Sequence, residues 1–304
     1  MGRHQFRSSF LFVVFFTLLA ILGCSTTNSL TRKISLGKSK LKKRVMILPF
    51  IDQAGIGTEQ TSQMTSSFID HLKKSSHIIV HPSDPSFAQP QNPRSPQFGI
   101  VIQPELIRMA EESNLNALIT GILAPIEITT KKGGIWPFRN MNRHFQTSVI
   151  VNAVDVATGT LILTSLKSKE EKVPLDDFFD EMESEVEPET VKQIASEVFP
   201  SIVGQQASVV ASTLGEEPWY GKVLSVEENS LVVNAGSEVG VQPGHRFEVF
   251  SMGEPVRSRS GVVFHSLGKK VGEVKVVSTT NDRSVCTLPD NSSFKVGQIV
   301  RSVN

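Results

Sequence analysis

Arg44-Val-Met-Ile-Leu-Pro-Phe-Ile51 is the stretch that decides the fold of this chain. It is a short, continuous apolar run after a basic segment, and a loop with Gly55 and Gly57 follows it. A run of this length between charge and a Gly-rich loop is typical of a buried strand. The sequence therefore predicts that its first folded domain opens with this strand.

Strand and helix patterns alternate after this run. A helix is expected to begin with Thr58 as a capping residue and to bury Met64, Phe68 and Leu72, which share one helical face. Residues 77–81, His-Ile-Ile-Val-His, are expected to form a second strand. This alternation predicts a sheet with helices packed on it.

The pattern then changes toward antiparallel strands. After a Pro-rich loop, Pro104 opens a helix with a core face of Leu106, Met109 and Ala110, and residues 117–123 read as another buried strand. Residues 122–131 and 144–156 read as longer strands. A hairpin over residues 154–162 is expected to turn at Gly159.

A long helix closes the first domain. An acidic stretch over residues 176–189 lacks the ligand spacing of a calcium loop and is interpreted as solvated. Pro188 begins the helix, and Leu214-Gly215 is expected to end it. Pro200 is expected to kink or divide it, because proline removes a helical hydrogen bond.

Short strands and turn residues fill the rest of the chain from Trp219. Strands are expected near residues 221–226, 231–234, 246–250, 271–277, 284–288 and 298–303. Gly244 and Gly297 follow similar apolar positions and are expected to form corners before strands. We therefore predict an α+β chain: an α/β sheet domain over residues 44–215, followed by a small all-β barrel or sandwich over residues 219–304.

The N-terminus carries a secretion signal. Arg3 and Arg7 precede an apolar run of thirteen residues, Phe10–Leu22, which is too short for the about 20 residues of a membrane-spanning helix. Ile21-Leu-Gly-Cys24 resembles the lipobox of bacterial lipoproteins, in which the cysteine is acylated and the preceding peptide is cleaved. The resemblance implies a signal peptide over residues 1–23 and lipidation at Cys24. An ordinary signal peptide with a chance cysteine is the alternative.

Residues 24–43 are interpreted as an acylated tether. Stable membrane attachment by acyl chains requires two signals or more. By the same resemblance, Ser25 after the cysteine implies the periplasmic face of the outer membrane. A basic run from Arg32 to Arg44 either contacts anionic headgroups or keeps a solvated linker extended.

Charge and cysteine usage exclude some roles. The net charge of +1 argues against a global attraction to nucleic acid. Acylation of Cys24 would leave Cys286 alone, so no internal disulfide is expected. Cys286 lies in an expected strand and is interpreted as a small buried hydrophobe.

The search for chemistry predicts no enzyme, cofactor or metal site. No Gly-x-Ser-x-Gly motif is present. His77 and His81 lack an evident third ligand. The Gly55–Gly57 loop lacks a third glycine and a following Lys-Ser or Lys-Thr, and Asp52 would repel phosphate.

An aromatic and basic loop is the candidate contact site. Trp136 and Phe138 flank Pro137, and Lys131, Lys132 and Arg139 lie beside them. Aromatic residues often dominate interface energies, and basic flanks would also suit a lipid surface. The alternative is that both rings fold back over the core.

These stretches resemble known families. Arg44–Phe50 and Asn116–Gly121 are similar to the N-terminal α/β domain of the Tol-system protein TolB, which has relatives in the curli secretion lipoprotein and in the flagellar assembly protein FlgT. Residues 221–223, 233–237 and 240–244 resemble the FlgT C-terminal domain. FlgT begins with a further domain, which a short tether replaces here.

The resemblance implies a non-enzymatic envelope lipoprotein that acts as an assembly or scaffold factor, most plausibly for the flagellar basal body. Envelope or basal-body proteins are the expected partners, and a homo-oligomer is left open. A curli-type secretion channel component and a regulator of cell-wall synthesis are the alternatives.

Overall fold

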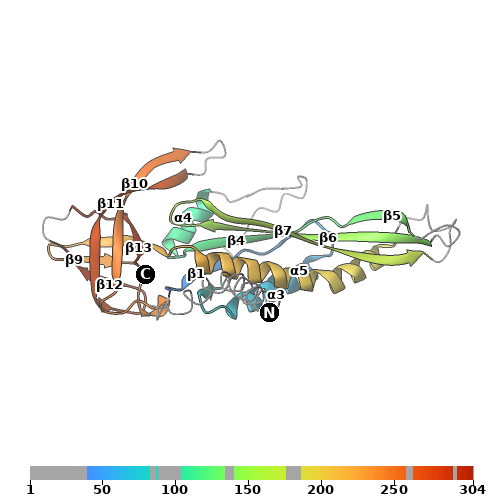
Figure 1. Cartoon of the computed structure of the whole chain (residues 1–304), viewed down its shortest axis with the longest axis horizontal. Coiled ribbons are helices and arrows are strands. Elements are labelled where there is room, and N and C mark those ends of the chain that lie inside the picture. Colours follow the sequence, from blue (N-terminus) through green and yellow to red (C-terminus); the bar gives the residue numbers. More distant parts are fainter. Residues whose placement is uncertain are drawn as a thin grey trace, which may run out of the picture. The chain divides into compact units, whose positions relative to one another are not determined.

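The computed structural model describes residues 40–82, 87, 104–133, 140–175, 186–257, 263–289 and 293–303. Within them the chain forms two sheets and a few helices (Figure 1). This arrangement confirms the α+β class. Residues 40–303 form one compact unit.

The first sheet has seven strands, and its main path runs β3-β1-β4-β6-β5. β2 also pairs with β4, and β7 with β6. β1 is parallel to both of its neighbours, whereas β4, β5 and β7 are antiparallel to β6. The strands are β1 Lys43–Ile47, β2 Ile51–Asp52, β3 Ile78–His81, β4 Ala117–Leu123, β5 Glu127–Gly133, β6 Asn140–Asp155 and β7 Leu161–Leu175.

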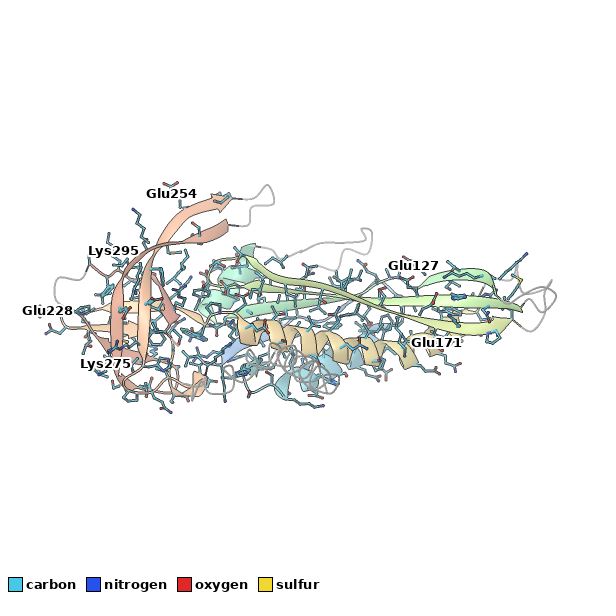
Figure 2. The ribbon with its side chains drawn as sticks, viewed as in Figure 1. Glu127, Glu171, Glu228, Glu254, Lys275 and Lys295 are labelled. Carbon is cyan, nitrogen blue, oxygen red and sulfur yellow. The ribbon has the colours of Figure 1, made fainter. Side chains whose placement is uncertain are left out.

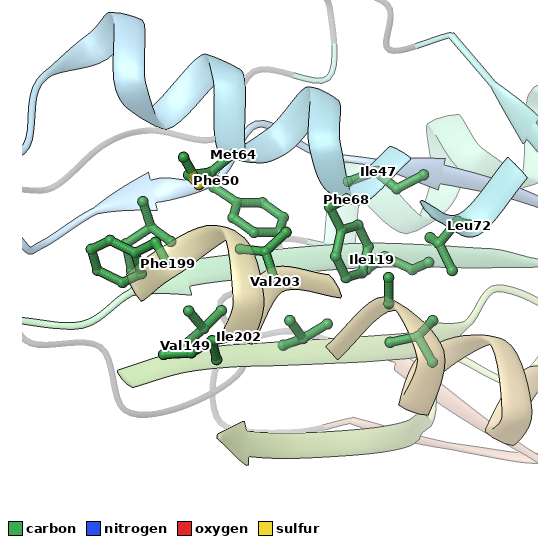
Figure 3. Close-up of a cluster of buried hydrophobic side chains, with 14 of the residues drawn as sticks. Ile47, Phe50, Met64, Phe68, Leu72, Ile119, Val149, Phe199, Ile202 and Val203 are labelled. Carbon is green, nitrogen blue, oxygen red and sulfur yellow. The ribbon is translucent and has the colours of Figure 1, made fainter. Parts of the chain in front are cut away.

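Helices cover both faces of this sheet. α3 (Thr58–Lys73) and α5 (Pro188–Glu216) lie on one face, and α4 (Pro104–Glu112) lies on the other (Figure 1). The predicted face of α3 is buried at Met64, Phe68 and Leu72. These side chains pack with strand residues and with α5 in the main core (Figure 3), whose labelled members are Ile47, Phe50, Met64, Phe68, Leu72, Ile119, Val149, Phe199, Ile202 and Val203.

Pro200 does not divide α5. The helix runs continuously over 29 residues with Pro200 inside it. Of the two predicted effects of Pro200, a kink or a division, division is therefore excluded. Pro200 itself is exposed, whereas its neighbours Phe199 and Ile202 are almost completely buried. The apolar face on the sheet therefore outweighs the hydrogen bond that proline removes.

The second sheet closes on itself in the order β10-β11-β12-β9-β8-β13. Trp219, Phe247 and Val249 are among its core residues. Gly244 and Gly297 both have positive φ, as expected for corners before β10 and β13. The elements are β8 Tyr220–Val226, β9 Ser230–Val233, the short 3-10 helix η2 Ser237–Val239, β10 Arg246–Arg257, β11 Val263–Thr279, β12 Ser284–Thr287 and β13 Ile299–Ser302.

β10 and β11 are longer than predicted. Their pairing continues past the barrel as a two-stranded ribbon, residues 251–257 with residues 263–269, which we call the arm (Figure 1). Glu254 lies on it (Figure 2). A Cβ on Gly253 would come within 2.7 Å of the backbone oxygen of Ser266. The glycine therefore permits a close approach of the two strands rather than a turn.

Candidate functional site

The two modules of the folded unit meet at β1, where two consecutive cations are buried. The exposed fractions of Lys43 and Arg44 are only 5% and 2%. Because successive side chains of a strand point to opposite faces, they lie on opposite faces of the sheet. Both belong to the basic run that was expected either to contact lipid headgroups or to form a solvated linker, and Arg44 also opens the predicted strand. Their burial excludes both expectations for these two residues.

Arg44 joins the sheet directly to the barrel. Its Nε lies 3.2 Å from Glu238 Oε2, and its Nη1 donates to the backbone oxygen of Asn234 at 3.1 Å. Its backbone N–H donates to Asn116 Oδ1 at 2.8 Å. Nη2 is buried without a hydrogen-bond partner among the described residues. On the face of the sheet that carries α4, charge-assisted bonds thus join the sheet to the barrel.

Three asparagines continue this contact. Asn234 Nδ2 donates to Asn114 Oδ1 at 2.6 Å, and Asn234 Oδ1 accepts from the backbone N–H of Lys222 at 2.6 Å. Asn116 Nδ2 donates to the backbone oxygen of Tyr220 at 2.7 Å. Asn114 has a φ of 60°, a conformation that asparagine tolerates better than most residues. The amides therefore satisfy backbone groups on both modules.

The opposite face, around Lys43, encloses a pocket of about 250 Å³. Lys43 Nζ donates to the backbone oxygen of Glu217 at 3.0 Å. Asp155 Oδ2 accepts from both the backbone N–H and the hydroxyl of Thr158, at 2.8 and 2.6 Å. The pocket is lined by Lys43, Asp155, Thr158, Thr160, Leu161, Ile162, Glu217, Pro218, Tyr220 and Leu267.

Burial shifts both charges of this pocket toward their neutral forms. It lowers the pKa of Lys43 to about 8, although Asp155 and Glu217 oppose the change. It raises the pKa of Asp155, although hydrogen bonds from Thr158 and the charge of Lys43 oppose that. Shifts of this kind are frequent at functional sites but also occur in structural charge clusters.

The arm and the chain entering from the N-terminal side both reach this junction. The backbone N–H of His265 in the arm donates to the backbone oxygen of Thr158 at 2.8 Å. Leu41 is buried in the barrel core, and the N–H of Lys42 donates to Val239 in the barrel at 2.9 Å. The entering chain therefore crosses the barrel before it forms β1 in the sheet.

The predicted contact loop is described only in part. Trp136, Phe138 and Arg139 lie outside the described residues, between β5 and β6. Lys131 and Lys132 are exposed on β5. Lys131 Nζ lies 3.1 Å from Glu170 Oε1, which also lies 2.8 Å from His144 Nδ1. Lys131 is thus engaged in a surface cluster with β6 and β7.

The other sequence candidates have plain structural roles or lie outside the described residues. Cys24 lies outside them. Asp52 accepts from the backbone N–H groups of Gly55, Ile56 and Gly57, so its carboxylate uses the donors that a phosphate would need. Cys286 is buried, and burial raises its pKa to about 12.

Two negative findings apply to the described part of the chain. There, no group of three His, Cys, Asp or Glu side chains is arranged to hold a metal ion. The helices of the same residues include none with the length and apolar character required to cross a membrane.

No protein-family model matches the chain, and no curated protein matches it. Several solved structures resemble part of it. A hypothetical protein from Chlamydia trachomatis is 14% identical with a TM-score of 0.33, and the match covers 56% of this chain and 99% of that one. Lipoprotein GNA1162 from Neisseria meningitidis is 13% identical with a TM-score of 0.29, over 55% and 99%.

A PelC dodecamer from Paraburkholderia phytofirmans is 10% identical with a TM-score of 0.30, over 55% of this chain and 89% of that one. At these values the likenesses assign neither a family nor an activity to this chain. Its function is therefore argued from its own residues.

Proposed function

We propose that the chain is a non-enzymatic envelope lipoprotein, acylated at Cys24, that acts as a scaffold on the periplasmic face of the outer membrane. The observation that carries the scaffold role is the junction, where Arg44 and the asparagines bond the barrel to the sheet. A scaffold has to hold two binding surfaces in a fixed relation. Bonds from Arg44, Asn116 and Asn234 support such a relation better than an open linker does.

The anchor is tested first. Metabolic labelling with a palmitate analogue is expected to mark the wild-type protein and to leave Cys24→Ala unmarked and unprocessed. Cys286→Ala is the matched control and is expected to label normally. Label on the Cys24→Ala protein, or an unlabelled wild type in the soluble fraction, would contradict the anchor.

The open edge of the first sheet supports a docking role. β7 extends over 15 residues and pairs with β6 on one side. Its outer half carries Lys167, Lys169 and Lys172, and Pro174 lies near its end. Charges and proline at an edge suppress uncontrolled pairing with other chains, while extended peptides bind selectively at such edges.

The Trp136 loop is the proposed anchor for a partner protein. A photoreactive amino acid at position 137 is expected to crosslink this partner in intact cells. Replacing Trp136 and Phe138 with alanine is expected to abolish the crosslink while leaving thermal unfolding unchanged, because the aromatic rings would supply the binding energy. Lys169→Ala is the surface control. A crosslink that persists in the double variant would remove the loop from the interface.

The flagellar basal body is the proposed machine, and its support is the sequence resemblance to the FlgT C-terminal domain of three stretches, residues 221–223, 233–237 and 240–244. Two glycines of these stretches have structural roles: Gly240 has positive φ, and a Cβ on Gly236 would lie 2.4 Å from the backbone oxygen of Asn281. Isolated basal bodies are expected to contain the protein, and its deletion is expected to reduce motility. If isolated basal bodies lack the protein and the deletion strain has normal motility, the scaffold role belongs to another machine.

Two observations weigh against a secretion channel built from β5, β6 and β7. Phe145 and Val149 pack in the core with α5, so their face of the sheet is covered. The opposite face carries polar residues such as Glu127 and Gln146, which pair across the strands. A lipid-facing surface would require an apolar row instead. The protein is therefore expected to give no conductance in planar bilayers.

A further inference from the structure

The pocket beside Lys43 holds two opposite charges that do not form an ion pair with each other. Lys43 and Asp155 are close enough to affect each other electrostatically, yet no contact within 4.0 Å joins their charged atoms among the described ion pairs. Lys43 donates one of its three ammonium protons to the backbone oxygen of Glu217. Asp155 uses Oδ2 for Thr158.

Lys43 and Asp155 therefore each keep unused hydrogen-bonding capacity: two ammonium protons on Lys43 and the Oδ1 atom on Asp155. Buried charges that are not paired destabilise a protein, and a bound molecule that pairs with both groups would relieve this cost. A carboxylate would find the remaining protons of Lys43, and an ammonium group would find Asp155 Oδ1. A single molecule that carries both groups would satisfy both residues together.

The remaining walls restrict the size and character of that molecule. The pocket volume of about 250 Å³ lies below the roughly 300–1,000 Å³ of drug-sized ligand sites, so the occupant is small. Leu161, Ile162 and Leu267 contribute apolar surface, and Thr160 contributes a hydroxyl. These walls suit an aliphatic side chain beside the charged groups.

We propose that the junction pocket binds a small zwitterion of the amino-acid class, with its carboxylate on Lys43, its ammonium on Asp155 and an aliphatic side chain on Leu161, Ile162 and Leu267. An anion without an ammonium group would be repelled by the carboxylates of Asp155 and Glu217. A cation without a carboxylate would be repelled by Lys43. The zwitterion avoids both conflicts. This site goes beyond the scaffold role and does not depend on it.

The position of the pocket gives binding a structural consequence. Its walls come from β1, the β6–β7 turn, the segment after α5 and the arm, so an occupant contacts both modules. A ligand that binds the folded protein and not the unfolded chain raises the unfolding temperature. Thermal unfolding is therefore a direct reporter of occupancy.

The test uses the full chain in detergent micelles and three matched probes. L-leucine carries both charges, 4-methylpentanoate lacks the ammonium, and 3-methylbutylamine lacks the carboxylate. L-leucine is expected to raise Tm and to give a saturable calorimetric signal, and the other two to bind at least tenfold more weakly. No binding of L-leucine, or equal binding of either single-charge probe, would overturn the proposal.

Variants locate the site. Lys43→Met and Asp155→Asn are each expected to weaken L-leucine binding at least tenfold, whereas Lys269→Met, at an exposed arm position, is expected to leave it unchanged. Thr160→Val and Leu267→Ala alter wall residues that are less buried, so these variants keep the test decisive even if Lys43→Met and Asp155→Asn do not fold. Each is expected to weaken L-leucine binding at least threefold. Full affinity in both of these variants would place any binding elsewhere and reject the pocket.

Discussion

The two faces of the junction treat neighbouring cations in opposite ways. Arg44 is joined directly to Glu238 and to the backbone of Asn234, whereas Lys43 lies beside a pocket and is separated from the carboxylate of Asp155. A guanidinium keeps its charge in any protein, while an ammonium shifts its pKa readily when buried. The comparison shows that the α4 face joins the two modules by direct bonds. The opposite face instead holds a pocket and two titratable groups.

The largest effect is expected from breaking the bonds of the α4 face. Arg44→Met removes a donor from Glu238 and from the backbone oxygen of Asn234, and it should lower the free energy of unfolding by about 3 to 4 kcal/mol. Urea unfolding of the full chain measures this loss. Arg283→Met, at an exposed pair with Asp282, is the control and should cost less than about 1 kcal/mol. Equal costs for both variants would mean that the junction is not fastened by Arg44.

The second prediction concerns pH at the other face. Lys43 has a folded pKa of about 8 against an ordinary value of 10.5, so the unfolded chain binds more protons between these two values. Stability from this group therefore rises as pH increases from about 8 to 10.5, and Lys43 is destabilising below that window. The stability of Lys43→Met relative to wild type should fall by about 2 to 3 kcal/mol across the window.

The difference between the two proteins is the quantity to measure. Cys286 has a pKa raised to about 12, so its folded form retains a proton that the unfolded chain loses above about pH 9, and its contribution to stability falls with pH. This opposing effect is present in both proteins and cancels in the difference. Parallel pH curves for wild type and Lys43→Met would show that Lys43 is not shifted.

A smaller effect is expected in the asparagine contact. Asn234→Ala removes the acceptor of the Lys222 N–H and the partner of Asn114, and it should cost about 2 kcal/mol. Asn229, an exposed turn residue, provides the alanine control and should change stability little. Thermal unfolding of both variants provides the comparison, and a cost at position 234 no larger than at position 229 would argue against this contact.

The smallest effect is expected far from the junction. Lys131→Ala breaks a surface ion pair with Glu170 and should cost less than about 1 kcal/mol, with a still smaller cost in high salt. Chemical unfolding at two salt concentrations checks this. A cost comparable to that of Arg44→Met would mean that the outer sheet contributes as much electrostatic stability as the junction does.

The sequence predicts local elements well where an apolar pattern or a turn residue determines them. Pro104 begins α4, Gly159 turns the β6–β7 hairpin with positive φ, and β12 begins at Ser284 as predicted. The arm was missed because Gly253 and Pro255 are typical of loops. Its strands depend on pairing with residues 263–269, which a local pattern does not reveal.

The junction was not predicted because its bonds are long-range. Arg44 contacts residues 190 and 194 positions away, and its place at the start of the predicted strand did not indicate these partners. The useful signal was the adjacency of two cations to a fully apolar strand, since β1 had to begin within the basic run. Pairing of Asn114 and Asn116 with the barrel likewise requires knowledge of the fold.

The entry of the chain through Leu41 determines how a mechanical load reaches the protein. Tension applied to the chain before Leu41 would act first on the Leu41 side chain inside the barrel and then along β1, which hydrogen bonds hold between β3 and β4. Such a load is thus shared by both cores, instead of peeling away a peripheral strand.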